Sequence, residues 1–361
     1  MLRKSLLGAA VLALVGLSAC GSGSSASFNS QPPGQTGVFN VRPGACTNSS
    51  SPDCFTATVG CTGTADIGVS VLTTNPTGTV KGTIFLHGGA GGEDFYDVTS
   101  GNTSYLQSYL DAGFRVVQVA WDSNWEDTGL DTKSVKSAAC RPATLLKYVY
   151  DTVHGGPSGA GAMCAQGHSG GSGALAYILA QYHGGSYLDK VMLTSGPVFS
   201  DIEQGCMRPK APAVTICPAA QFGCVGDSWQ ADPQLPTNRA YWTSDSTCEG
   251  KESTTSSASN TAWKAMSIVD GLSDSTFTYP QTAVSGYLCG NGLGPAQAQG
   301  GLFYQNFTSS SQTAAFSLYR VDGCADAEDI DDGFLSAGPN AGQPTFTVTV
   351  DDMIDGCVQR H

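Results

Sequence analysis

The sequence is poor in the residues that most often hold metal ions. It has five histidines in 361 residues, and none of its 13 cysteines forms a Cys-x-x-Cys pair. Zinc sites are built from clusters of these two residue types at short spacing. We therefore predict no metal site, and we expect no cofactor.

Positive charge is scarce as well. Lys and Arg together number 17 against 30 Asp and Glu, which gives a formal net charge of −13 at pH 7. Proteins that bind nucleic acids gather Lys and Arg into basic patches that neutralise phosphates. The sequence has no such patch, so we predict no nucleic-acid partner.

Long apolar runs are scarce. One apolar run stands at the N-terminus, and it is shorter than a membrane-spanning helix needs. Arg3 and Lys4 precede the run LLGAAVLALVGL, in the order that signal peptides have. The following Leu17-Ser18-Ala19-Cys20 resembles the lipobox of bacterial lipoproteins, in which the cysteine is lipidated and becomes the new N-terminus. An ordinary secretory signal peptide is the alternative.

This N-terminal pattern predicts where the protein resides. We expect a lipoprotein signal peptide over residues 1–19, followed by the lipidated Cys20 and a Gly/Ser-rich flexible tether over 20–37. A lipidated N-terminus on a tether would anchor the protein to a membrane of the bacterial cell envelope, facing the periplasm or the exterior.

Twelve cysteines remain once Cys20 is set aside, which is an even number. In an exported protein this favours up to six disulfide bonds. Residues 198–260 hold four of the twelve, together with several prolines, and show no sustained hydrophobic period. We interpret this region as a disulfide-stapled insertion.

Strand-like and helix-like segments alternate through the rest of the chain. Alternation of this kind predicts an α/β protein whose sheet is mostly parallel and carries helices on both faces. The expected strands are 67–73, 79–86, 114–121, 161–168, 190–195, 282–288 and 314–321, and the expected helices are 103–112, 137–153, 171–182, 295–306 and 347–358.

Two glycine-rich motifs follow two of these strands. Gly167-His168-Ser169-Gly170-Gly171 leads from strand 161–168 into a helix, and His87-Gly88-Gly89-Ala90 follows strand 79–86. A serine between glycines on a sharp strand-to-helix turn is typical of a nucleophile elbow. With these motifs the chain resembles the α/β-hydrolase superfamily, in particular its lipases and esterases, from about residue 65 to 358.

The resemblance implies a fold and a set of catalytic roles. The fold would be the α/β-hydrolase fold in a domain over 38–361, interrupted by the insertion. Ser169 would be the nucleophile that attacks an ester carbonyl. The N–H group of Gly170, with that of Gly89 or Ala90, would form the oxyanion hole.

The general base and acid are not where the family pattern puts them. After the last strand, where the family carries its histidine, the sequence has Ala325 and Asp326. The usual acid position, after the preceding strand, offers Asn291 and no carboxylate. Cys289 and Cys324 stand at the ends of these two strands, so they could bridge one another, or Cys324 could bridge Cys357.

The remaining histidines and carboxylates can be compared by position. His87 belongs to the glycine loop, His168 is expected to face the sheet, and His154 and His183 are expected at the opposite sheet edge, which leaves His361 as the candidate base. Asp201 follows the strand after the elbow helix, which is a second acid position in some lipase-like members of the family. Asp122, Asp322 and Asp326 also stand at strand ends and could take over part of the role of the base, although we expect such aspartates to be solvated.

Two functions fit these observations. The glycine motifs favour a lipid-anchored serine hydrolase that acts on carboxylic esters. The missing base and acid favour a protein of the same fold that has lost catalysis and binds a ligand or partner in the cleft.

Overall fold

The computed structural model describes residues 35–42, 44–46, 48–129, 134–202, 264–269, 278–290, 299–301, 303–304, 312–324 and 330–358. The predicted signal peptide, Cys20, most of the predicted tether, most of the predicted insertion with its four cysteines, Asn291, Asp326 and His361 lie outside these residues.

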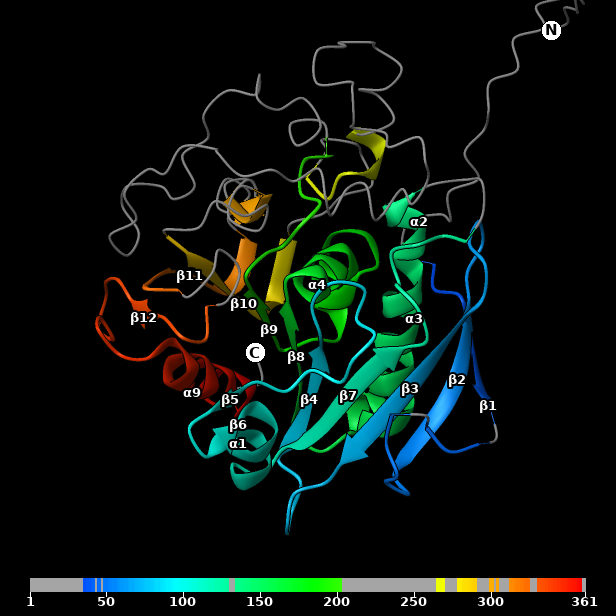
Figure 1. Ribbon diagram of the computed structural model, residues 1–361, viewed down its shortest axis with the longest axis horizontal. Coiled ribbons are helices and arrows are strands. Elements are labelled where there is room, and N and C mark those ends of the chain that lie inside the picture. Colours follow the sequence, from blue (N-terminus) through cyan, green and yellow to red (C-terminus); the bar gives the residue numbers. More distant parts are fainter. Residues whose placement is uncertain are drawn as a thin grey trace, which may run out of the picture.

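A ten-stranded mixed sheet runs through the described part of the chain (Figure 1). Its central strands are parallel, and its antiparallel pairs lie towards the two sides. In spatial order the strands are β1 (Val38–Arg42), β2 (Cys54–Gly60), β3 (Ile67–Thr74), β7 (Arg115–Trp121), β4 (Gly82–His87), β8 (Ala162–His168), β9 (Lys190–Thr194), β10 (Thr278–Cys289), β11 (Gln312–Asp322) and β12 (Phe334–Leu335).

Helices cover both faces of this sheet, as Figure 1 shows. One core cluster joins α3 (Cys140–Tyr148) and α4 (Gly170–Gln181) to side chains such as Phe85 and Ala165. The other joins α1 (Tyr105–Asp111) and α9 (Thr345–Val358) to Leu86 and Cys164. Because neighbouring strand residues point to opposite faces, the strands β4, β7, β8, β9, β10 and β11 contribute side chains to both clusters. The predicted α/β-hydrolase fold with helices on both faces is therefore confirmed.

Several predicted elements differ from those in the structure. The helix expected over 137–153 is divided into α2 (Val135–Ala138), α3 and a π-helical turn at Val149–His154. The first two strands were not predicted at all. β1 is almost wholly exposed and therefore carries no alternation of apolar and polar residues.

The start of the predicted insertion pairs with a segment that follows the predicted end at residue 260. The N–H of Ile268 donates to the carbonyl of Phe199 at 3.1 Å, and that of Val269 donates to the carbonyl of Ser200 at 3.0 Å. The Ile202 N–H also reaches the hydroxyl of Ser267 at 2.9 Å. The described residues that flank positions 203–263 are therefore neighbours in the fold.

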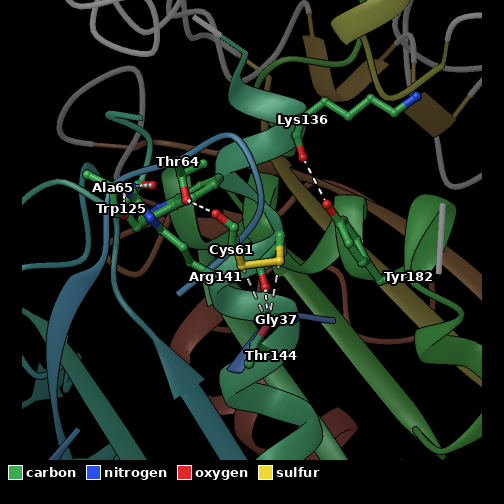
Figure 2. Close-up of a disulfide and its surroundings, with 10 residues drawn as sticks. Gly37, Cys61, Thr64, Ala65, Trp125, Lys136, Arg141, Thr144 and Tyr182 are labelled. Carbon is green, nitrogen blue, oxygen red and sulfur yellow. Dashed lines mark hydrogen bonds between the residues drawn. A yellow bond between two sulfur atoms is a disulfide. The ribbon is translucent and has the colours of Figure 1, made fainter. Parts of the chain in front are cut away.

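Four disulfides link cysteines among the described residues. One of them, Cys61–Cys140, attaches the N-terminal strands to a helix (Figure 2). It joins the end of β2 to the start of α3. Beside it, the Thr144 hydroxyl accepts the N–H of Gly37 at 2.7 Å. The last residue of the predicted tether is thus already fixed on the domain.

Arg141, next to that disulfide, binds backbone carbonyls of two loops. Its guanidinium is 1% exposed and donates to the carbonyls of Ala65 at 2.5 Å and Trp125 at 3.0 Å, as well as to that of Asp127. Burial lowers its pKa to about 10. These bonds hold the segment after β7 against the loop between β2 and β3.

In the part of the chain that the structure describes, every helix is too short or too polar to span a bilayer.

Candidate active site

Ser169 stands on a turn that few serines adopt. Its backbone has φ 48° and ψ −110°, between the end of β8 and the first residue of α4. A positive φ is unusual for a residue with a Cβ and marks a strained position. The flanking glycines make the turn possible, because a Cβ on Gly167 would lie 2.5 Å from the carbonyl of Gly171, and one on Gly171 would lie 2.4 Å from that of His87.

The glycine loop after β4 lies directly against this turn. A Cβ on Gly89 would come within 3.3 Å of the Ser169 Cβ, and one on Gly170 would come within 2.1 Å of the Ala90 oxygen. Ala90 itself has a positive φ of 47°. The structure thus brings together Ser169, Gly170, Gly89 and Ala90, which are the residues that the resemblance assigns to the nucleophile and the oxyanion hole.

His87 supports the glycine loop and has no nitrogen left for catalysis. Its Nδ1–H donates to the Gly88 carbonyl at 2.9 Å, and its Nε2 accepts the indole N–H of Trp121 at 3.1 Å. These two bonds require the neutral ring. Burial lowers the pKa of His87 to about 4. Its role is therefore structural, as expected from its place in the loop.

The other described histidines have partners other than the Ser169 hydroxyl or lie far from it. His168 stacks on Tyr96 with 5.6 Å between ring centroids, and its Nδ1 lies 3.3 Å from the Thr194 hydroxyl. His154 bonds Thr83 at the start of β4, and His183 is exposed after α4. Four residues of strand separate Thr83 from His87, or about 13 Å, so His154 lies at the opposite sheet edge, as predicted.

The candidate carboxylates occupy different parts of the molecule. The backbone of Asp201 is held by the Gln299 amide, which accepts its N–H at 2.6 Å and donates to its carbonyl at 2.9 Å. Asp122 pairs with Arg42 at 3.4 Å and Asp322 with Arg320 at 3.1 Å, with about half of each carboxylate side chain exposed. Asp122 and Asp322 are thus partly solvated, as expected.

No hydrogen bond joins the Oγ of Ser169 to any residue that the structure describes. His361 and Asp326, the sequence candidates that remain, fall outside those residues.

A cavity of about 280 Å³ opens beside the glycine loop. Its lining includes Gly88–Gly91 and three carboxylates that the sequence analysis did not single out, Glu93, Asp94 and Asp97. The signal was present in the sequence, because all three lie within seven residues of the glycine motif. Acidic residues after a glycine loop are common on surfaces, so the sequence alone gave no reason to select them.

The two strand ends where the family carries its acid and base are joined covalently. Cys289 ends β10, Cys324 follows β11, and a disulfide with a Cα–Cα distance of 6.3 Å connects them. Of the two pairings left open by the sequence, this one is confirmed and Cys324–Cys357 is wrong. Cys357 instead bridges Cys164 on β8.

The strand order, the strained serine turn and the glycine loop against it together define an α/β-hydrolase fold with an elbow at Ser169. No protein-family model and no curated protein sequence matches the chain.

Solved structures with a similar backbone include several esterases. The acetyl xylan esterase of Paenibacillus sp. R4 is 9% identical, with a TM-score of 0.48 and 90% of each chain covered. A fungal esterase of Rhizomucor miehei is 11% identical at a TM-score of 0.46, over 91% of this chain and 85% of that chain. A thermostable carboxyl esterase of Bacillus coagulans is 13% identical at 0.43, over 86% of this chain and all (100%) of that chain. Scores and identities this low do not decide the activity of this chain.

Proposed function

We propose that this protein is a serine hydrolase of carboxylic esters, exported and anchored to the cell envelope through a lipid on Cys20. The observation that carries the activity is the contact between the strained Ser169 turn and the Gly89–Ala90 loop. In the proposal, the N–H groups of Gly170 and of Gly89 or Ala90 stabilise the tetrahedral oxyanion, and the closeness of the two loops supports this. The free N–H groups at the start of α4 add to the same positive potential.

The proposed reaction proceeds in two stages. The Oγ of Ser169 bonds to the ester carbonyl carbon, the alcohol leaves with a proton, and water then hydrolyses the acyl-enzyme. The base that removes the serine proton is proposed to be His361, with Asp201 as the acid that orients it. His87 is excluded as the base, because Trp121 and Gly88 occupy both of its ring nitrogens.

A second function is favoured by a specific observation. The Oγ of Ser169 has no hydrogen-bond partner among the described residues, and a serine without a base is a weak nucleophile. A catalytically inactive protein that binds a ligand or partner in the same cleft would keep the fold and the glycine loops for packing alone.

Labelling with a fluorophosphonate probe separates these two functions. We expect the purified oxidised protein to be labelled at Ser169 and Ser169→Ala to be unlabelled. Ser70→Ala is a matched control, because the Ser70 hydroxyl is buried in β3 and has no hydrogen-bond partner among the described residues. Loss of labelling in His361→Ala or Asp201→Asn would then identify the base and its partner. A folded wild-type protein that resists the probe would favour the binding function.

A further inference from the structure

We propose that Ser172 and Thr194 are positioning residues for the nucleophile, holding the backbone of Ser169 in its strained conformation. The proposal rests on the proposed function only in taking Ser169 as the nucleophile. Both side chains are fully buried, and the hydroxyls bind backbone carbonyls of the turn and of β9, with the Thr194 hydroxyl also 3.3 Å from His168 Nδ1. They would act on the reaction through the turn that they bind.

Thr194 binds the turn from the neighbouring strand. It is the last residue of β9 and is paired in register with His168 on β8. Its carbonyl accepts the N–H of Ser169 at 2.9 Å, and its hydroxyl donates to the carbonyl of Gly167 at 3.1 Å. One residue of β9 thus contacts the turn on both sides of His168.

Ser172 binds the same turn from the helix that follows it. Its hydroxyl lies 2.6 Å from the Gly167 oxygen and 2.7 Å from the Thr194 oxygen, so a single O–H is shared between the two carbonyls. This bond connects the start of the turn to the strand residue that holds its centre. The Gly167 carbonyl and the Thr194 carbonyl each accept two hydrogen bonds as a result.

The two hydroxyls matter because the backbone of Ser169 is strained. A non-glycine residue at φ 48° persists only where its surroundings hold it. α4 begins at the next residue, and helical bonding alone would favour a negative φ at position 169. Without the shared Ser172 bond, we expect the turn to relax and the Ser169 Oγ to move relative to the Gly89–Ala90 loop.

A small displacement of the nucleophile should lower reactivity more than binding. A shift of about 1 Å at a reacting group can cost about 100-fold in rate. We therefore expect Ser172→Ala and Thr194→Val to reduce the rate of fluorophosphonate labelling by about 10- to 100-fold. The effect should fall on the rate at saturating probe, while half-saturating probe concentration stays near that of the wild type.

Two comparison variants separate positioning from general destabilisation. Thr194→Ser keeps the hydroxyl and should restore most of the labelling rate that Thr194→Val loses. Ser70→Ala removes a buried hydroxyl that has no partner among the described residues, and it should label at the wild-type rate. All rates are compared well below the melting temperature of each variant, so that partial unfolding does not contribute.

Amide hydrogen exchange of residues 167–173, read by mass spectrometry, tests the proposal without relying on activity. Exchange should become faster in Ser172→Ala and Thr194→Val and stay unchanged in Ser70→Ala. A wild type that is not labelled would overturn the proposed function, while the exchange data would still decide on the positioning role. Wild-type labelling with unchanged rates and unchanged exchange in both variants would overturn the positioning proposal.

Discussion

A histidine that is buried and bonded at both nitrogens responds to pH through stability rather than through catalysis. In the folded protein His87 has a pKa of about 4, against 6.5 for the unperturbed side chain. Between these two pH values the unfolded chain binds a proton at this position and the folded protein does not. Stability contributed by the neutral ring is therefore complete above pH 6.5 and is lost as the pH falls towards 4.

This linkage can be measured as a difference between two proteins. We expect His87 to account for about 3 kcal/mol of the decrease in unfolding free energy between pH 7 and pH 4. His87→Asn should be less stable at pH 7 and should lose less stability over the same range. Urea unfolding at a series of pH values tests this, and parallel pH profiles for the two proteins would contradict it.

At the scale of single residues, the sequence predicts which residue types the Ser169 turn needs, but not which side chains form hydrogen bonds to it. Gly167 and Gly171 were expected around Ser169, because a sharp turn leaves no room for a side chain, and the structure gives that reason in distances. Ser172 and Thr194 were not predicted to support the site. Their hydroxyls form hydrogen bonds to the turn only once β8, β9 and α4 are packed together. No spacing along the chain signals a hydrogen bond between residues 22 positions apart.

At the scale of elements, the central strands were predictable and the outer ones were not. Buried strands such as β8 (AMCAQGH) and β9 (KVMLT) contain short apolar runs bounded by polar residues, which the sequence displays directly. β1 is almost wholly exposed and lies at the edge of the sheet, so its residues show no pattern. The division of helix 137–153 was also hidden, since the same apolar residues suit an α-helix and a π-helical turn.

Disulfides that close loops of different length should differ in their effect on stability. Cys164–Cys357 joins residues 193 positions apart, whereas Cys46–Cys54 joins residues 8 apart. The entropy of the unfolded chain predicts losses of about 5 kcal/mol and about 2.5 kcal/mol when each bond is removed. We expect the Cys164→Ala/Cys357→Ala protein to be the less stable of the two double variants.

Denaturant unfolding of both variants, under conditions that keep the other disulfides oxidised, measures this difference. The Cys46→Ala/Cys54→Ala protein serves as the matched control, because all four cysteines are buried. Equal losses in the two proteins would show that local packing, and not loop closure, sets the contribution of these bonds.

At the scale of the whole molecule, the proposed lipid anchor makes a prediction of its own. In this proposal the lipid at Cys20 is what holds the protein at the membrane. Protein expressed with its signal peptide should partition into the detergent phase on cloud-point separation, and Cys20→Ser should remain in the aqueous phase. Equal partition of the two would contradict the anchor.

Residues 199–202 and 267–269 are hydrogen-bonded to one another, and the two segments would lie on different polypeptides if the chain were cut between them. One cut anywhere between residues 203 and 263 would produce two polypeptides, with Ser169 on one and β10, β11 and α9 on the other. The Cys164–Cys357 bond would still join them. A protease acting on this region would therefore leave a nicked protein of unchanged mass on a non-reducing gel, which separates into two fragments only when a thiol is added.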